Sequence, residues 1–223
     1  MFVERPRGPE PDPSVINMLK TLSPSTLGHL TDVGFPRGLR PLFTPISIVG
    51  PAVTVRIPHL DSAAVHCAMD VVKPGDVVVV EQCGDEDRAP WGALVTTAAM
   101  AKGVAGAVVQ GGVTDAAQLR AWRFPIFSRT VSALTTRILG IEGALNVPIA
   151  VGGAVVRPGD IVWADENGIA VLSPEEAARY ASIVAEKEAA EPPLLERIRR
   201  GESLAELSGA RELLRRNAAG ENV

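Results

Sequence analysis

The sequence has few of the residues on which disulfide and zinc chemistry depend. Its 223 residues include two cysteines, Cys67 and Cys83, and three histidines, His29, His59 and His66. Two cysteines do not make a disulfide framework, and the absence of a Cys-X-X-Cys pair argues against structural zinc. The histidines show no HExxH or HxH spacing, so we expect any metal ion here to be a hard cation with oxygen ligands.

A strong charge of either sign and a long apolar run are also missing. The 22 basic and 26 acidic residues leave a net charge of -4, which offers no electrostatic footprint for nucleic acid. The longest apolar candidate, residues 104–113, is too short to span a bilayer and is rich in glycine. The polar N-terminus lacks the apolar core of a signal peptide, so we expect a cytoplasmic protein.

The order of apolar segments predicts an α/β fold. Residues 77–82 and 105–112 have the composition of buried strands, and residues 62–72 and 92–103 have apolar residues at helical spacing. Residues 147–173 are β-rich and punctuated by Gly-Gly, Pro-Gly-Asp and Asn-Gly turns. A helix is predicted from Ser173, with Pro174 in its first turn.

These patterns divide the chain into three parts. Residues 1–13 are predicted to be a flexible arm, because they are polar and rich in proline. Residues 14–191 form the α/β domain. Residues 192–223 form a charged helical extension that begins at a proline pair.

Asp115 is the first candidate for chemistry. It follows an apolar strand and a glycine pair in the segment AVVQGGVTD, residues 107–115, so its side chain is expected at the carboxyl end of that strand. Open α/β sheets bind ligands at this edge. Asp115 can hold Mg²⁺ with several waters, or it can cap the short helix that follows.

A second candidate is the helix start at Gly92, Ala93, Leu94 and Val95. Its first amides have no partner inside the helix, so they can bind a carboxylate or a phosphate, and Arg88 can supply a charged fork for the same anion. The alternative is a plain helix start beside a surface arginine.

Other charged residues carry weaker signals. Asp61 and His66 lie close together in the sequence, although such a pair is usually structural. Arg129 and Arg137 flank TVSALTT and can bind an anion or face solvent. No GxSxG, P-loop or GxGxxG pattern is present.

Over about residues 20–190 the chain resembles the RraA-like family, which includes 4-hydroxy-4-methyl-2-oxoglutarate and 4-carboxy-4-hydroxy-2-oxoadipate aldolases and the regulator of ribonuclease E activity. The resemblance rests on the order of GPAVTV, PGDVVVVE, WGALVTTAAMAKGVAGAVVQGGVTD, FPIFSR and VPIAVGGAVVRPGDIVWADENGIAVLS. It implies a β/β/α swivelling-domain core with mixed sheets and helices. It also implies homotrimers or homohexamers with sites between subunits.

For the site, the resemblance implies that a pyruvyl group chelates Mg²⁺ or Mn²⁺. It assigns the pyruvyl carboxylate to the amides at residues 92–95 and the metal to Asp115. An acid in the C-terminal helix of the adjacent subunit, Glu188 or Glu186, is implied to hold metal-bound water.

Two positions depart from the aldolase pattern. The aldolases carry arginine where this chain has Thr114, and the loss of one donor to a developing oxyanion can cost about 10²–10³ in rate. They also tend to carry aspartate where this chain has Ala93. Arg88 or Arg129 is a candidate to replace the missing charge. The regulators show the reverse loss, because they keep the arginine and lose the aspartate.

The resemblance thus implies a divalent-metal-dependent lyase that cleaves or decarboxylates a 2-oxo acid through a pyruvate enolate. Asp115, Thr114 and Arg88 are its expected catalytic residues. The alternatives are a diverged relative that acts on another oxo or hydroxy acid, and a non-enzymatic regulator that binds a protein partner.

Overall fold

A computed structural model describes residues 1–220, and the chain forms two compact units, Met1–Ala181 and Ser182–Val223. The strands are β1 (Phe2–Glu4), β2 (Arg40–Pro41), β3 (Ser47–Pro58), β4 (Val77–Cys83), β5 (Gly106–Val113), β6 (Ile126–Val131), β7 (Gly143–Leu145), β8 (Ile149–Val151), β9 (Ala154–Val156), β10 (Ile161–Asp165) and β11 (Gly168–Leu172). The helices are α1 (Pro13–Leu19), α2 (Pro24–Leu27), α3 (Ala63–Val71), α4 (Ala93–Ala101), α5 (Ala116–Trp122), α6 (Pro174–Arg199), α7 (Leu204–Leu207) and α8 (Ala210–Ala218).

The first unit is built on a mixed nine-stranded sheet. Its main path runs β1-β7-β3-β4-β5-β6-β2, and β3 to β6 are parallel neighbours. The parallel strands alternate with α3, α4 and α5, as the sequence predicts. A separate two-stranded hairpin joins β8 to β9 through the predicted Gly-Gly turn.

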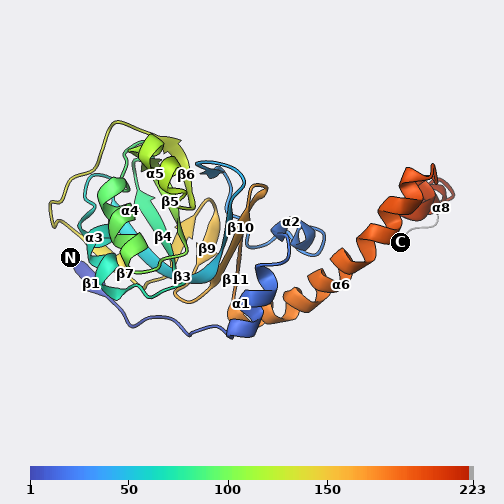
Figure 1. The fold of residues 1–223 in the computed structure, drawn as a ribbon, viewed down its shortest axis with the longest axis horizontal. Helices are drawn as coiled ribbons and strands as arrows, with labels where there is room; N and C mark the ends of the chain where they lie inside the picture. Colours follow the sequence, from blue (N-terminus) through green and yellow to red (C-terminus); the bar gives the residue numbers. More distant parts are fainter. Residues whose placement is uncertain (221–223) are drawn as a thin grey trace. The chain divides into compact units, whose positions relative to one another are not determined.

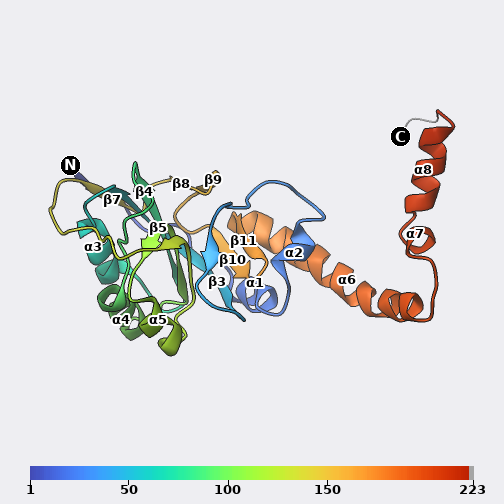
Figure 2. The ribbon, with the colours of Figure 1, turned by 90° about the horizontal axis from the view of Figure 1, so that it is seen from above.

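Both faces of the parallel sheet are buried, and each face belongs to a different core. Along β4, Val78 and Val80 face a core shared with α3, α4 and α5, whereas Val77 and Val79 face a core shared with β8 to β11. Figure 2 shows α3, α4 and α5 along one side of the sheet and the β8–β9 hairpin along the other. This double burial explains why β4 is continuously apolar.

Strand β3 links the two parts of this mixed fold. The sequence predicts a strand pair or a bent strand over this segment, and the structure forms one strand of 12 residues. Residues 47–51 pair with β10, and residues 52–58 pair with β4. Gly50 lies at the crossover, where a Cβ would come within 2.1 Å of the Gly75 carbonyl oxygen. The fold is therefore the expected α/β type with mixed sheets.

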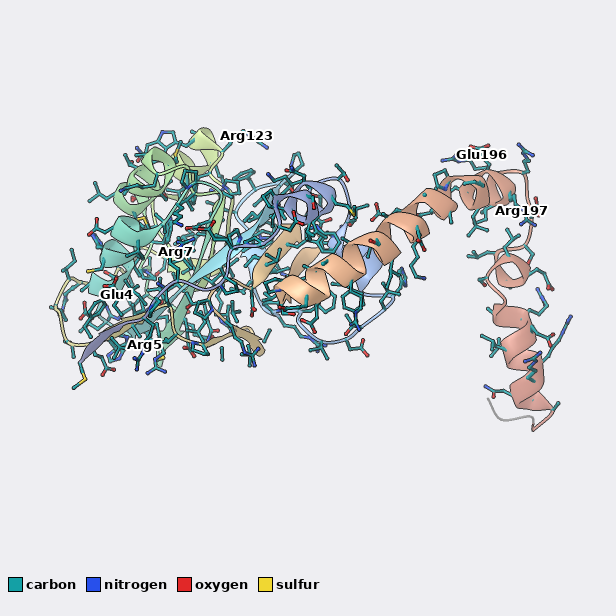
Figure 3. The ribbon with its side chains drawn as sticks, turned by 90° about the horizontal axis from the view of Figure 1, so that it is seen from below. Glu4, Arg5, Arg7, Arg123, Glu196 and Arg197 are labelled. Atoms are coloured by element: carbon teal, nitrogen blue, oxygen red, sulfur yellow. The ribbon has the colours of Figure 1, made fainter. Side chains whose placement is uncertain are left out.

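The N-terminal segment is more ordered than the predicted flexible arm. Residues Phe2–Glu4 pair with β7, and the Arg7 guanidinium donates two hydrogen bonds, of 2.7 and 2.8 Å, to the Asp76 carboxylate. Figure 3 shows Arg7 on this segment where it crosses the first unit. Asp76 is 1% exposed, so the pair is largely removed from water. The sequence does not predict this order, because a short parallel pairing and a single ion pair leave no periodic pattern in it.

Helix α6 begins in the first unit with the predicted cap. Ser173 and Glu176 form a capping box, in which each side chain accepts the other's backbone N–H at 3.2 and 2.9 Å. The helix then runs without interruption through Pro192 and Pro193, where the sequence predicts the start of a separate extension. Residues 186–193 are exposed or half-buried, so water can reach the carbonyl groups that lose an N–H partner.

The second unit consists of the rest of α6 with α7 and α8, the red end of the chain in Figure 1. It is charged, as the sequence predicts, and carries exposed ion pairs such as Arg197–Glu202 at 2.7 Å. Across both units, no helix within residues 1–220 is long and apolar enough to cross a membrane.

Candidate functional site

Two chain segments meet at the carboxyl end of β5 and form the centre of the candidate site. The Thr114 backbone N–H donates to the Trp91 carbonyl oxygen at 2.9 Å, and Trp91 and Val113 form an isolated parallel bridge. This pairing brings the residues after β5 next to the start of α4. Asp115 follows in the left-handed conformation, with φ of 54°, which aspartate tolerates better than most residues.

The Asp115 carboxylate lies at the start of α4 rather than at the start of its own helix. Its Oδ2 accepts the backbone N–H of Ala93 at 2.8 Å. Its side chain makes no capping hydrogen bond to α5. The predicted cap on the following helix is therefore wrong, because the left-handed backbone turns the carboxylate toward a helix 22 positions earlier. There it meets the positive end of the α4 dipole.

Gly92 permits this close approach. A Cβ at position 92 would lie 2.6 Å from the Thr114 methyl carbon and 2.8 Å from Asp115 Oδ2. Both distances are shorter than side chains tolerate, so any larger residue would displace the carboxylate. The glycine is needed here for space, since its φ of -153° is open to other residues.

A cavity of about 310 Å³ surrounds this carboxylate. The sequence-predicted residues that line it are Gly92, Ala93, Leu94, Val95, Thr114 and Asp115. The two segments that the sequence analysis singled out therefore line one cavity. Asp115 and Leu94 are exposed at the cavity, and Trp91 and Val95 form its buried wall.

The first turn of α4 leaves backbone donors at this cavity. The first bond of the helix joins the Thr96 N–H to the Gly92 carbonyl oxygen at 3.0 Å. Ala93 donates to Asp115, whereas the N–H groups of Leu94 and Val95 have no hydrogen-bond partner in residues 1–220. The remaining donors point to a site for an anion, because helix N-termini carry partial positive charge.

The three candidate arginines have different surroundings. Arg88 does not line the cavity, because its guanidinium donates to Asp85 Oδ2 at 3.0 Å and to the Thr135 carbonyl oxygen at 3.1 Å. Arg129 forms an ion pair with Glu86. Arg88 therefore does not form the expected charged fork at the start of α4, and Arg129 is not among the described residues that line the cavity.

Arg137 and His66 do line the cavity, together with residues 135, 136 and 138 of the same loop. Arg137 and His66 carry only weak signals in the sequence. Their contribution depends on contacts between segments that are distant in the sequence, which no local pattern encodes.

Buried Asp61 fixes the loop that carries Arg137. Its carboxylate accepts the backbone N–H groups of Ala63, Leu139 and Ile141 at 2.9, 3.1 and 2.6 Å. Burial alone would raise the pKa of Asp61, but these backbone donors outweigh it and hold the pKa below its usual value. Asp61 therefore has a structural role, as is usual for an acidic residue that lies near a histidine in the sequence.

Glu188, the second predicted metal ligand, lies on the part of α6 in the second unit. Within residues 1–220 no three His, Cys, Asp or Glu side chains form a group that could hold a metal ion. Among the described residues of a single copy, Asp115 is thus the one carboxylate that lines the cavity.

A larger cavity, of about 800 Å³, lies elsewhere in the first unit. It is bounded by the β8–β9 turn and the start of α6, and Asp160 lies in its wall. Burial raises the pKa of Asp160, and the nearby acidic groups Glu176 and Glu175 add to the shift against the backbone N–H of Arg157. None of the predicted site residues lines this cavity, so its size does not identify the site.

The fold and the carboxylate cavity together define a class: a mixed α/β protein with an acidic side chain at the carboxyl edge of its parallel strands. Residues 25–171 match the family model described as RraA-like, Aldolase/RraA. The chain belongs to the RraA-like family.

Two relatives show how far the likeness extends. A Halalkalibacterium halodurans protein with the provisional name 4-hydroxy-4-methyl-2-oxoglutarate aldolase is 40% identical over 134 residues, which is 60% of this chain and 63% of that protein. The chain thus matches less than two thirds of that relative. An uncharacterised Methanocaldococcus jannaschii protein is 32% identical over 200 residues, 86% of this chain and 92% of its own length.

Among solved structures, Streptomyces coelicolor RraAS2 matches with a TM-score of 0.73 and 27% identity, over 82% of this chain and 96% of that one. That protein is described as an unusual member of the RNase ES inhibitor RraA family. The family therefore includes proteins named for an aldolase reaction and proteins named for inhibition of a ribonuclease.

Proposed function

We propose that this protein is a divalent-metal-dependent lyase that cleaves or decarboxylates a 2-oxo acid and releases pyruvate through its enolate. The observation that carries the proposal is the Asp115 carboxylate, held at the start of α4 in a cavity of small-molecule size. The aldolase name of the Halalkalibacterium halodurans relative supports the same class of reaction.

The start of α4 would bind the substrate carboxylate. The N–H groups of Leu94 and Val95 have no partner in the described chain, and they lie at the positive end of the helix dipole. The Ala93 N–H already donates to Asp115, so it is not available to the substrate. The amides of Leu94 and Val95 thus remain to hold and orient a planar carboxylate.

Asp115 fits a hard divalent cation. Oδ1 accepts no hydrogen bond in residues 1–220, and Mg²⁺ is commonly held by one or two carboxylates with several waters. We assign Asp115 as the ligand from one copy of the chain and Glu188 as the acid from a neighbouring copy. When bound, Mg²⁺ or Mn²⁺ would act as a Lewis acid that polarises the 2-oxo group.

Retro-aldol cleavage and β-decarboxylation make the same demand on the surrounding residues. Both break a carbon–carbon bond and leave negative charge on the pyruvyl fragment. Groups fixed near that charge lower the barrier more than flexible ones do, since they need no reorganisation. Thr114 contributes only a neutral hydroxyl, so this site needs its positive charge from another residue.

A second candidate is a non-enzymatic regulator that binds a protein partner. The likeness to Streptomyces coelicolor RraAS2 favours it, whereas Thr114 and Asp115 reverse the residue pattern that the resemblance implies for the regulators. A regulator of this kind would not depend on the Asp115 carboxylate for its function. The two candidates therefore differ in the effect of substitutions at Asp115.

Mn²⁺ binding measured by electron paramagnetic resonance tests the proposed role of Asp115. Asp115→Asn keeps an oxygen that can accept the Ala93 N–H but removes the charge, so we expect at least tenfold weaker Mn²⁺ binding with little change in stability. Asp115→Ala also removes the cap on α4, and we expect a loss of about 0.5–2 kcal/mol in unfolding free energy. Mn²⁺ affinity in Asp115→Asn equal to that of the wild type would rule out Asp115 as the ligand.

A further inference from the structure

The candidate site has one permanent cation in its wall. Of the fifteen described residues that line the cavity, Arg137 is the only arginine, and no lysine is among them. His66 is the one other basic side chain in this set. An anionic substrate beside the Asp115 carboxylate needs a positive charge close by, and position 114 does not provide one.

The guanidinium of Arg137 also has no interaction partner among the described residues. It makes no hydrogen bond or ion pair within residues 1–220, whereas Arg88 is bound to Asp85 and Arg129 is paired with Glu86. Arg137 is exposed, so its side chain can reach a ligand without the loss of an existing contact. The two arginines that the sequence suggested as substitutes are thus engaged elsewhere.

The backbone of Arg137 is held firmly. Its N–H donates to the Leu60 carbonyl oxygen at 2.8 Å, and its carbonyl oxygen accepts from Ser62 N–H at 2.8 Å and from Ser62 Oγ at 3.3 Å. The buried Asp61 carboxylate ties residues 139 and 141 to the same place. The fixed backbone and the free guanidinium together leave the side chain available to a ligand in the cavity.

We propose that Arg137 is a substrate-binding residue that pairs with a carboxylate of the 2-oxo acid and supplies the positive charge that Thr114 lacks. The inference rests on the proposed function for the identity of the substrate. A guanidinium offers a planar fork of donors that matches a carboxylate, and charge-assisted bonds of this kind are stronger than neutral ones. Arg137 from the loop and the amides of α4 would then hold the anion from two directions.

Calorimetric titration with oxalate, a small dicarboxylate probe, tests the proposal in saturating Mg²⁺ and again in EDTA. We expect Arg137→Gln to bind oxalate about 10- to 100-fold more weakly than the wild type, the range for loss of one charge-assisted hydrogen bond. Arg137→Lys keeps the charge without the fork and should lie between them. Arg157→Gln, a change of another exposed arginine outside this cavity, should bind like the wild type.

The salt dependence adds a readout that a merely structural role would not change. The affinity of the wild type should fall with rising ionic strength, and this dependence should be smaller in Arg137→Gln because the exposed charge is gone. Unchanged oxalate affinity in Arg137→Gln would overturn the proposal. A loss that follows His66→Gln instead would also overturn it, as would the absence of oxalate binding by the wild type.

The outcome is separable from that of the proposed function. If the wild type releases no pyruvate but Arg137→Gln loses oxalate affinity, the lyase assignment fails and Arg137 remains the anion-binding residue. If pyruvate is released with unchanged KM and kcat in Arg137→Gln, the lyase assignment holds and the role of Arg137 is refuted.

Discussion

At the scale of single residues, Gly92 decides whether the Asp115 carboxylate can reach α4. We expect Gly92→Ala to displace Asp115 or Thr114, because the new Cβ would lie within 2.8 Å of both side chains. Overpacking of this kind typically costs about 1–3 kcal/mol. Thermal unfolding should show the loss, and Mn²⁺ affinity should fall with it.

Gly28→Ala is the matched control for that substitution. Gly28 has an ordinary helical φ of -60°, and its nearest crowding atom is a single carbonyl oxygen 3.2 Å from the added Cβ. It lies outside the cavity, so Mn²⁺ affinity should stay at the level of the wild type. If Gly92→Ala behaved like Gly28→Ala, the close packing around Asp115 would not be needed for the site.

At the scale of the elements, Asp61 connects α3 to the loop that carries Arg137. Asp61→Asn removes the charge and turns an amide group toward at least one backbone N–H, so a buried donor loses its partner. We expect the unfolding free energy to fall by about 1–3 kcal/mol. Oxalate affinity should fall as well, because the loop would no longer hold Arg137 in place. Asp12→Asn is the control, since asparagine caps a helix as well as aspartate does.

The same residue predicts a dependence of stability on pH. Because the pKa of Asp61 is lowered in the folded protein, its stabilisation is complete above the ordinary value of about 3.8 and is lost as pH falls through the lower folded value. Chemical denaturation of the wild type below pH 3.8 should therefore show a steeper loss of stability than that of Asp61→Asn. Parallel curves would show that Asp61 ionisation does not stabilise the fold.

The sequence predicted the regular elements better than their contacts. Helices α3 and α4, strands β4 and β5, and the Ser173 cap follow local periodicity and capping chemistry, so they could be located in advance. The contact of Asp115 with Ala93 and the position of Arg137 depend on the register between distant strands. Helix α6 continues through Pro192 and Pro193, although proline inside a helix removes a backbone donor. An exposed helix can tolerate this loss, because water can bond to the carbonyl groups left without a partner.

At the scale of the whole molecule, an apolar loop borders the cavity. Residues 131–141 expose Val131, Leu134, Ile138, Leu139 and Ile141, with Ile138 at 66%, and Leu94 is exposed beside them at 82%. Apolar side chains gathered in this way usually mark an interaction surface. We propose that a second copy of the chain packs against these apolar side chains in a homotrimer or homohexamer.

Sedimentation velocity of the wild type should therefore show a trimer or a larger assembly. Ile138→Glu should weaken it, because a charge buried in an apolar interface without a partner is costly. Val33→Glu, at an exposed apolar position outside this loop, should leave the assembly intact. A wild type that sediments as a monomer at assay concentration would remove the between-subunit site and the role proposed for Glu188.

Pyruvate release tests directly whether Asp115 holds a divalent metal for cleavage of a 2-oxo acid. Oxaloacetate and 4-hydroxy-4-methyl-2-oxoglutarate would be supplied with and without Mg²⁺ or Mn²⁺, and pyruvate would be followed with coupled lactate dehydrogenase. We expect metal-dependent pyruvate release above the rate of the free metal, and its loss in Asp115→Asn although that variant stays folded. No metal-dependent release from either substrate, or release that survives in Asp115→Asn, would contradict this role of Asp115.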